Sequence, residues 1–275
     1  MRLLKGHFQA FSEVFSMLIR HRDLTFAMAK REIADRYVGQ NFGIFWSIFH
    51  PLFMMGVYIF IFCFVFKTKM GGTVDMPRDY ITYLLSGLVA WLGFQESMAK
   101  SCVAMTTNAS LVKQVVFPLE ILPAKGVLSS MIQQSIMISL LVLYVLIDYQ
   151  SLPWTYLLLP LLIVLQAMMM TGIAYFLSAV GTYFRDLKDF VQLFAVAGIY
   201  MLPIVYLPSW VPTIFKPLLY ANPFSYFIWC YQDVLYFGRI EHPIAWWVTI
   251  IESIFIFIVG YRFFRKLKIG FGNVL

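Results

Sequence analysis

The sequence predicts an all-α integral membrane protein, and three observations support that fold class. Of the 275 residues, 61% are hydrophobic and only 13% are charged, whereas about a quarter of the residues in a soluble domain are charged. The runs 44–66, 126–147, 149–184 and 190–215 contain no Asp, Glu, Lys or Arg. Such runs are long enough to cross a bilayer, which takes about 20 mostly apolar residues. This composition excludes a soluble globular enzyme, a disordered protein and a disulfide scaffold.

Six helical spans are expected in a membrane domain that covers residues 44–275. Their ranges are 44–66, 80–105, 119–147, 154–180, 190–207 and 244–261. If the N-terminus is cytoplasmic, the segments facing the cytoplasm hold 14 Lys and Arg, and those facing outward hold five. Because basic residues are retained on the cytoplasmic side, both termini are predicted to be cytoplasmic. The net charge of +7 then suits anionic lipid headgroups and does not indicate nucleic-acid binding.

Residues 1–43 are expected to form cytoplasmic helices ahead of the first span. Asp23 can cap a helix over 23–41, in which Phe26, Ala29, Ile33 and Tyr37 recur at three- and four-residue spacing. This pattern is typical of a helix in the membrane interface, with its apolar side toward acyl chains and its bases toward phosphates. The helix is either a simple juxtamembrane anchor or a collar on which a cytosolic partner pushes.

The loop between the second and third spans is short and predicted to be cytoplasmic. Thr107, Asn108 or Ser110 can cap one short helix there, and Pro118 can end it. Such a helix is either a docking element for a cytosolic protein or an ordinary hairpin connection, and the sequence favours neither.

A proline-rich segment separates the last two spans. Five of the twelve prolines lie between residues 203 and 223, interleaved with aromatic residues. Proline this dense cannot sit in one continuous helix, yet the segment is too apolar for a free loop. We therefore expect residues 208–238 to form short re-entrant helices in the outer leaflet, in preference to an aromatic belt at the membrane surface.

The sequence contains none of the motifs for covalent chemistry that were sought. No glycine is followed by lysine, so the phosphate-binding loop of a nucleotide hydrolase is absent. The four histidines are far apart, and there is no Asp-x-Asp pair. We therefore expect no catalytic residue, no metal site and no cofactor in this chain.

Ionisable residues inside the predicted spans are the remaining candidates for function, because burying a charge in the membrane is costly unless it is paired or hydrated. Glu96 and Lys100 are four residues apart and can pair along one helix face. Glu252 lies near the middle of the sixth span with no base nearby in sequence. Two states remain open for Glu252: protonated and hydrogen-bonded across helices, or facing a hydrated channel.

Three classes of function are compatible with such a chain. A transport subunit driven by a separate cytosolic ATPase explains six spans without a phosphate-binding loop, together with short inner loops suited to docking. A membrane-embedded enzyme, such as a lipid-linked sugar transferase, needs polar catalytic residues on one face, and the outer loops offer few. A secondary transporter usually shows internal repeats, whereas here the proline cluster occurs in the second half only. The transport subunit is favoured.

Several stretches carry a resemblance to a known family. They are KREI at 30–33, HPL at 50–52, NASLVKQVVFPLEILP at 108–123, YFRDLKD at 183–189 and LPIVY at 202–206. From about residue 20 to its end, the chain resembles the permease subunits of type-2 ABC polysaccharide exporters. These proteins move O-antigen, teichoic acid and related lipid-linked glycans, and the 108–123 block is the most specific part of the match.

The resemblance implies a homodimer in the bacterial inner membrane with two copies of a cytosolic ABC ATPase, which binds ATP and Mg. The implied cargo is an undecaprenyl-diphosphate-linked polysaccharide, with O-antigen, and hence lipopolysaccharide biosynthesis, favoured. Capsule and teichoic acid exporters are the alternatives, and a sugar-lipid enzyme is a weaker one. By analogy, the 106–117 helix would dock in the ATPase. Its coupling residues would be Thr107, Asn108, Leu111, Lys113 and Gln114.

The resemblance also suggests where the cargo is held. For the diphosphate, the candidates are Arg31, Arg36 and Lys113, since a guanidinium offers phosphate a bidentate fork. For the sugar chain, aromatic rings suit a channel because sugar C–H faces stack on them. The aromatic residues proposed for the pore and its exit are Trp91, Tyr206, Trp210 and Tyr226.

Overall fold

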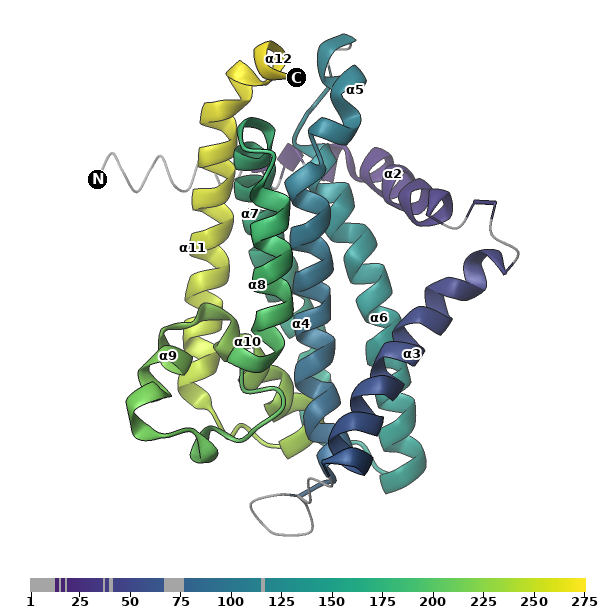
Figure 1. Cartoon of the computed structure of the whole chain (residues 1–275), viewed down its shortest axis with the longest axis vertical. Coiled ribbons are helices and arrows are strands. Elements are labelled where there is room, and N and C mark those ends of the chain that lie inside the picture. Colours follow the sequence, from purple (N-terminus) through teal and green to yellow (C-terminus); the bar gives the residue numbers. More distant parts are fainter. Residues whose placement is uncertain are drawn as a thin grey trace.

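The computed structural model describes residues 13–275 apart from 15, 18, 37, 40, 41, 67–76, 115 and 116. Within that part of the chain all regular structure is helical. The long helices run side by side along the longest axis of the molecule and form an elongated bundle (Figure 1). The all-helical class predicted from the composition is confirmed.

Helices lie at all six places where a span is predicted. They are α3 (Trp46–Ile59) with the π-helix η2 (Phe60–Val65), α4 (Tyr80–Val103), α6 (Ile121–Tyr149), α7 (Leu159–Tyr183) with η4 (Trp154–Leu158) before it, α8 (Leu187–Met201) and α11 (Pro243–Leu267). The fifth differs most from its predicted range of 190–207. It stops at Met201 because Leu202 is extended and precedes Pro203, and a residue before proline is disfavoured in helical conformation.

Four helices in the described chain are long and apolar enough to cross a membrane: Trp46–Val65, Ile121–Tyr149, Trp154–Tyr183 and Pro243–Val274. The helix α8 has 15 residues, fewer than a span usually needs. The helix α4 is long enough but more polar, and 17 of its 24 residues are buried. It occupies the centre of the bundle, packed against α6, α7, α8 and α10, so its environment is protein.

Among the described helices, α7 and α11 share the most extensive contact. Gly172 of α7 faces the backbone of Ile256 and Phe257, and Gly260 of α11 faces the backbone of Gly172. A methyl group at either glycine would overlap that backbone. Small residues at this crossing therefore let the two main chains touch, as they do in tightly packed membrane helices.

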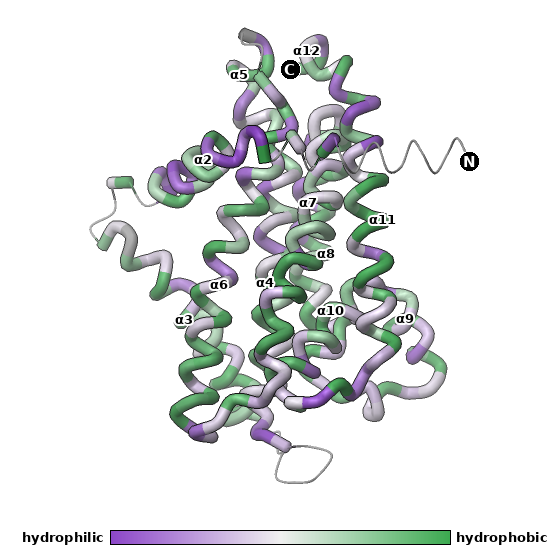
Figure 2. The backbone as a smooth tube through the Cα atoms, turned by 180° about the vertical axis from the view of Figure 1, so that it is seen from behind, coloured by the Kyte–Doolittle hydropathy of each residue, from purple (hydrophilic) through white to green (hydrophobic). Residues whose placement is uncertain are grey.

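The two ends of the bundle differ in the short elements they carry. At one end, called the α2 end below, lie α2 (Arg22–Asp35), α5 (Ala109–Gln114) and α12 (Phe271–Val274) (Figure 1). At the other, the α10 end, lie α9 (Lys216–Ala221), α10 (Pro223–Gln232) and the π-helix η7 (Asp233–Phe237). The helix α2 runs across the bundle axis and is rich in hydrophilic residues, whereas α3 and α11 are mainly hydrophobic (Figure 2).

The predicted interface helix is present but shorter, and its cap is different. The residue at the N-cap of α2 is His21, which makes no side-chain capping bond, so Asp23 lies in the first turn instead. The buried residues of α2 are Thr25 and Ala29, while Phe26 keeps 56% of its surface exposed. Tyr37, predicted on the same face, lies outside the described residues.

The predicted loop helix is also present, as the 3₁₀ turn η3 (Thr106–Asn108) followed by α5. Thr107 and Asn108 do not cap it. Their side chains donate to the carbonyls of Val103 and Ala104, both at 2.8 Å, so they extend the end of α4. Residues 115 and 116 of the predicted helix lie outside the described part.

Candidate functional site at the α2 end

An ion-pair cluster joins α2 to α4 and α6. Glu32 of α2 is its hub, because Oε1 lies 3.8 Å from Lys100 Nζ and Oε2 lies 3.4 Å from Lys125 Nζ. Ser129 Oγ donates to Glu32 Oε1 at 3.1 Å. Lys100 also donates to Ser129 Oγ at 2.5 Å. One acidic side chain thus ties three helices together.

Arg36 makes the second link, just beyond the end of α2. Its Nη1 donates to Glu96 Oε1 at 2.8 Å and to Gln133 Oε1 at 3.1 Å. The pair predicted between Glu96 and Lys100 is confirmed, with Lys100 Nζ 3.0 Å from Glu96 Oε1. Arg36 is 46% exposed and Glu96 16%, so the link runs from solvent toward the interior.

Sequence spacing explains why these groups meet. Glu32 of α2 and Arg36, the residue directly after α2, are four residues apart, and Glu96 and Lys100 are four apart on α4. On α6, the residues at positions 125, 129 and 133 repeat the same interval. Side chains four apart lie on one helix face, so three polar stripes converge where α2 crosses the bundle.

Two cavities flank the cluster. One has a volume of about 450 Å³ and is lined by Glu32, Ile33, Arg36, Ser47, Lys100, Ile132, Gln133 and Ile136. The other, of about 300 Å³, is lined by Glu32, Lys100, Val103, Ala104, Thr107, Asn108, Leu122, Pro123, Lys125 and Gly126. Because the cluster holds three cationic groups against two carboxylates, it carries an excess positive charge. A guanidinium and an ammonium beside apolar isoleucines can bind a phosphate group that carries a hydrocarbon chain.

The cluster extends to the segment before α5. Lys125 Nζ donates to Asn108 Oδ1 at 3.4 Å, so Asn108 is in contact with the same network. Leu111 of α5 packs against a buried apolar group that includes Met105, Phe264 and Phe271. Lys113 is exposed, and the side chain of Gln114 lies outside the described part.

The three predicted diphosphate ligands are not brought together. Arg36 lines the larger cavity. Arg31 is 83% exposed and pairs with Asp35 at 3.3 Å, and Lys113 lines neither cavity of the cluster. Lys100, which the sequence predicts to pair with Glu96, is the second cation at the larger cavity.

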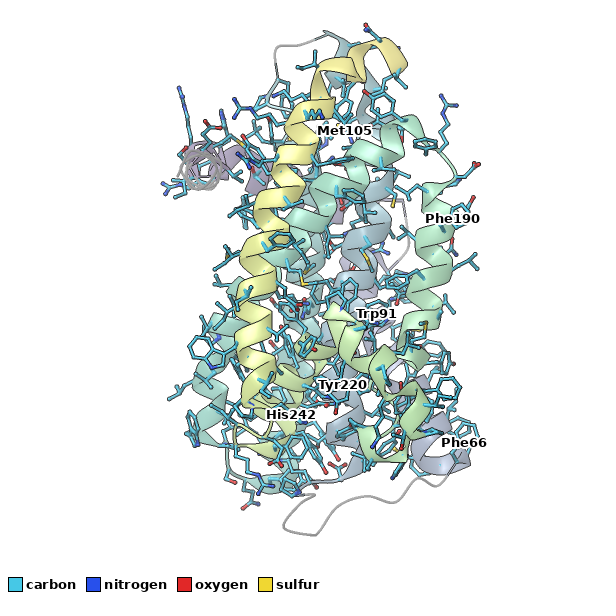
Figure 3. All side chains as sticks on the ribbon, turned by 90° about the vertical axis from the view of Figure 1, so that its left-hand side faces the viewer. Phe66, Trp91, Met105, Phe190, Tyr220 and His242 are labelled. Carbon is cyan, nitrogen blue, oxygen red and sulfur yellow. The ribbon has the colours of Figure 1, made fainter. Side chains whose placement is uncertain are left out.

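The prediction that Trp91 lines a channel is corrected. Its ring is fully buried in the interior of the bundle (Figure 3), and its Nε1 donates to the Ala195 carbonyl at 3.0 Å. Edge-to-face contacts to Phe194 and Phe224 complete its surroundings. Trp91 therefore belongs to the packing core of the subunit, because α4 is packed against α6, α7, α8 and α10 at the centre of the bundle.

The other predicted aromatics lie nearer the surface of the α10 end. Trp210 is 53% exposed, and Tyr206 and Tyr226 are half-buried. The Tyr226 hydroxyl donates to the Tyr220 carbonyl at 2.6 Å. Glu252 is half-buried, and its Oε1 is shielded from solvent and has no hydrogen-bond partner among the described residues. The cross-helix bond considered for Glu252 is absent for that oxygen.

The α10 end holds a second polar group of residues, which the sequence pattern does not predict. Asp233 is fully buried and accepts from the His242 backbone N–H at 3.1 Å and the Trp246 Nε1 at 3.0 Å. The His242 Nδ1 lies 2.8 Å from Asp233 Oδ1. Arg78, 7% exposed, donates to the Leu235 carbonyl and, at 3.2 Å, to the Tyr156 hydroxyl.

A third network, also missed, lies in the middle of the bundle. Gln134 Nε2 donates to Gln166 Oε1 at 2.8 Å and to the Tyr231 hydroxyl at 3.2 Å. Gln166 Nε2 donates to the Ala90 carbonyl at 3.1 Å. Gly93 leaves room for the Gln134 side chain, which a Cβ would displace. Glutamines inside charge-free runs were the available signal in the sequence.

Comparison with known proteins gives a consistent result. The family model described as "ABC-2 type transporter" matches residues 23–236. Two sequences named "O-antigen export system permease protein RfbA" from Klebsiella pneumoniae are 28% and 27% identical over 255 and 257 residues, each covering 92% of this chain and 95% of the relative. A protein of the same name from Myxococcus xanthus is 24% identical over 225 residues, or 81% of this chain and 84% of the relative.

Proposed function

The chain belongs to the ABC-2 type transporter family, and on that basis we propose that it is the transmembrane subunit of an ATP-driven exporter of lipid-linked polysaccharide. The relatives that cover most of its length are named as O-antigen export permeases. These names favour O-antigen as the cargo over capsule polysaccharide or teichoic acid. The chain then works in the bacterial inner membrane.

In this proposal the protein has six spans and two cytoplasmic termini. The helices α4 and α8 supply the second and fifth spans, since they run along the same axis as the four apolar helices (Figure 1). The excess of Lys and Arg near the α2 end supports a cytoplasmic position for that end. The elements from η5 (Pro208–Trp210) to η7 are re-entrant at the outer face, where Tyr206, Trp210 and Tyr226 meet the emerging sugar chain.

The partners are a second copy of this chain and two copies of a cytosolic ATPase, which bind ATP and Mg. The short α5 docks in the ATPase, with Lys113 toward the partner and Leu111 toward the permease core. Docking is supported by the position of α5, which projects from the α2 end of the bundle (Figure 1). The apolar contacts of Leu111 anchor α5 to the core.

The observation that carries the proposal is the ion-pair cluster. Asn108, directly before α5, contacts Lys125, and Lys125 contacts Glu32 of α2. A displacement of α5 by the ATPase therefore reaches the interface helix through two side-chain contacts. ATP binding closes the ATPases, α5 moves with them, and α2 shifts against α4 and α6.

Such a motion drives transport if the two conformations hold the cargo differently. We place the diphosphate of the cargo at the larger cavity, where Arg36 and Lys100 supply positive charge. The isoleucines of that cavity suit the first isoprene units. Rearrangement of Arg36 and Lys100 with Glu96 and Glu32 changes how much positive charge faces the phosphate.

The docking step is tested by reversing the charge of Lys113. We expect Lys113→Glu to reduce co-purification of the ATPase and surface display of the polymer, because it places an acid at the docking face. Lys188→Glu is the matched control, since Lys188 is also exposed and lies in the first turn of α8, not in α5. Equal recovery of the complex and equal export in the two variants would contradict the docking role.

The alternative of a sugar-lipid enzyme is tested on the isolated chain. We expect the purified permease, without its ATPase, to leave both ATP and lipid-linked sugars unchanged. Turnover of a lipid-linked sugar by the isolated chain would favour the enzyme.

A further inference from the structure

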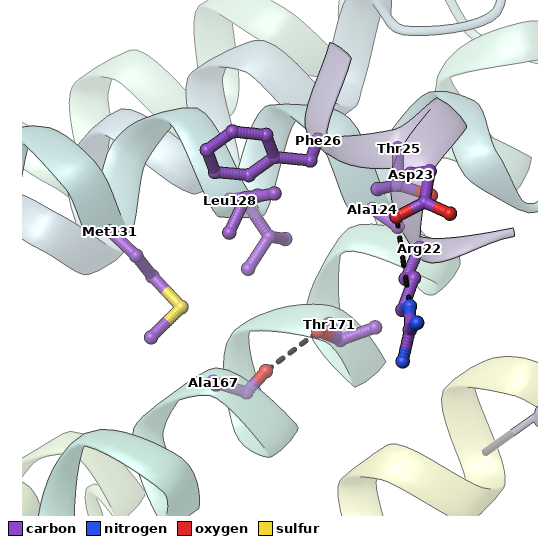
Figure 4. A pocket seen from close by; sticks show the side chains of 10 residues that line it. Arg22, Asp23, Thr25, Phe26, Ala124, Leu128, Met131, Ala167 and Thr171 are labelled. Atoms are coloured by element: carbon purple, nitrogen blue, oxygen red, sulfur yellow. Dashed lines mark hydrogen bonds and ion pairs between the residues drawn. The ribbon is translucent and has the colours of Figure 1, made fainter. Parts of the chain in front are cut away.

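A separate pocket opens at the other end of α2, under its first turn. Its volume is about 460 Å³, within the ~300–1,000 Å³ range of ligand pockets. The walls come from α2, α6 and α7 (Figure 4), and the lining residues are Arg22, Asp23, Thr25, Phe26, Ala124, Val127, Leu128, Met131, Ala167 and Thr171.

The interior of this pocket is mainly apolar. Its two hydroxyl groups already donate to their own helices: Thr25 Oγ1 to the His21 carbonyl at 3.0 Å, and Thr171 Oγ1 to the Ala167 carbonyl at 2.6 Å. The rest of the inner wall is formed by Ala, Val, Leu, Met and Phe side chains. A strongly polar ligand would lose most of its hydrogen bonds with water there and regain few of them.

The charged groups of the pocket are confined to its mouth. Arg22 and Asp23 lie on the side of the pocket opposite Met131 (Figure 4). Their nitrogen and oxygen are 3.6 Å apart, with side chains 75% and 96% exposed. An ion pair this exposed is weak, so the Arg22 guanidinium is available to a phosphate, for which its planar fork is suited.

The position of the pocket identifies the occupant. The helix α2 crosses the bundle where apolar helices give way to charged segments (Figure 2), which is the depth of lipid headgroups in a bilayer. We propose that the pocket holds one acyl chain of a membrane phospholipid, with its phosphate at Arg22. This site is distinct from the proposed cargo cavity, since Arg22 and Arg36 are about 20 Å apart along a helix that rises about 1.5 Å per residue.

The lipid gives α2 a second anchor. Ion pairs hold its C-terminal end to α4 and α6, and the acyl chain fills the space between its first turn and α6 and α7. The proposal holds whatever polymer the exporter carries, because it depends on the membrane and not on the cargo.

Native mass spectrometry of the complete transporter, released from detergent after mild delipidation, tests the site. The probe is the phospholipid that co-purifies, identified by its mass. Ala167→Phe fills the pocket from α7 and should lower the retained phospholipid about tenfold, as expected when on the order of ten atom contacts are lost. Val164→Phe, a half-exposed position on α7 that does not line the pocket, should retain lipid like the unmodified protein.

Substitutions at two further positions ensure that the test does not depend on the correct folding of a single variant. Met131→Trp fills the pocket from α6 and should have the same effect as Ala167→Phe. Arg22→Ala should lower the retention of anionic phospholipid, and Arg22→Lys should restore part of it. Equal phospholipid in the filled variants and in Val164→Phe would overturn the proposal, as would a bound mass that corresponds to a polyprenyl diphosphate.

Discussion

The α2 end and the α10 end of the bundle both hold charged residues, but they hold them differently. At the α2 end, Glu32, Lys100 and Lys125 bond to other long side chains, each partly exposed. At the α10 end, Asp233 and Arg78 are buried and form hydrogen bonds with backbone groups and aromatic side chains. Arg78 also lies over the Tyr149 ring, 5.2 Å from its centre.

The difference teaches which end can move. A bond to a backbone carbonyl is lost when the helix that carries the carbonyl shifts, and the buried group is then left unpaired at high cost. Long side chains in a mixed cluster can exchange partners while each remains paired. We therefore infer that the α2 end changes conformation during transport and that the α10 end stays fixed.

The largest expected effect comes from removing the fixed acid at the α10 end. Asp233→Ala leaves two N–H groups of His242 and Trp246 without an acceptor. We expect it to lower the free energy of unfolding by about 2–6 kcal/mol, because each buried donor left without an acceptor costs about 1–3 kcal/mol. Denaturant unfolding of the purified protein in detergent measures this. Glu241→Ala is the control, because Glu241 pairs with Arg239 and both side chains are over 40% exposed. An equal loss of stability in the two variants would contradict the view that Asp233 is a fixed, buried acid.

A smaller effect on stability is expected at the hub of the α2 end. Glu32→Gln keeps the shape of the side chain but loses its charge. It should cost about 1–2 kcal/mol, since its lysine partners are partly buried and Lys100 keeps Glu96. Export of polymer in cells should fall more than this loss implies, because the ion pair of α2 with Lys125, the residue that contacts Asn108, is lost. A stability loss as large as that of Asp233→Ala would show that this end is equally rigid.

The link between α2 and α4 should be weaker still. A double-mutant cycle of Arg36→Ala and Glu96→Ala should give a coupling free energy of about 0.5–1 kcal/mol, because Arg36 is 46% exposed and solvent screens the pair. The coupling should shrink further at high salt. A coupling free energy above about 3 kcal/mol that does not depend on salt would show that this pair behaves as a buried ion pair.

The smallest effect is expected on the outer face of α2. Asp35→Asn breaks an exposed pair with Arg31 and should change stability by no more than about 0.5 kcal/mol. Export should remain normal, which makes this variant the control for Glu32→Gln. Loss of export in Asp35→Asn would show that the whole of α2, and not its buried face, transmits the motion.

Much of the fold could be predicted because the membrane imposes it. Long, mostly apolar runs mark helices whatever their neighbours are, so a helix lies at each predicted span. The end of α8 was misplaced because hydropathy continues past Leu202, although the geometry before Pro203 stops the helix. The central position of α4 depends on packing, to which span prediction from hydropathy is insensitive.

The candidate site could be predicted only in part. The Glu96–Lys100 pair follows from spacing within one helix, whereas the contact of Glu32 with Lys125 joins residues far apart in the chain. Trp91 was assigned to a channel because aromatic residues suit both a sugar path and an apolar core. Burial distinguishes the two, and burial depends on the tertiary structure.

The glycine crossing of α7 and α11 has a consequence for the transport cycle. At this crossing the two main chains are in direct contact, with no side chains between them. Neither helix can therefore slide or rotate against the other without a backbone clash. In any conformational change, α7 and α11 therefore move together as one rigid body. The relative movement is then expected between α2 and the helices α4 and α6. Their contacts are made by long charged side chains, which can exchange ion-pair partners.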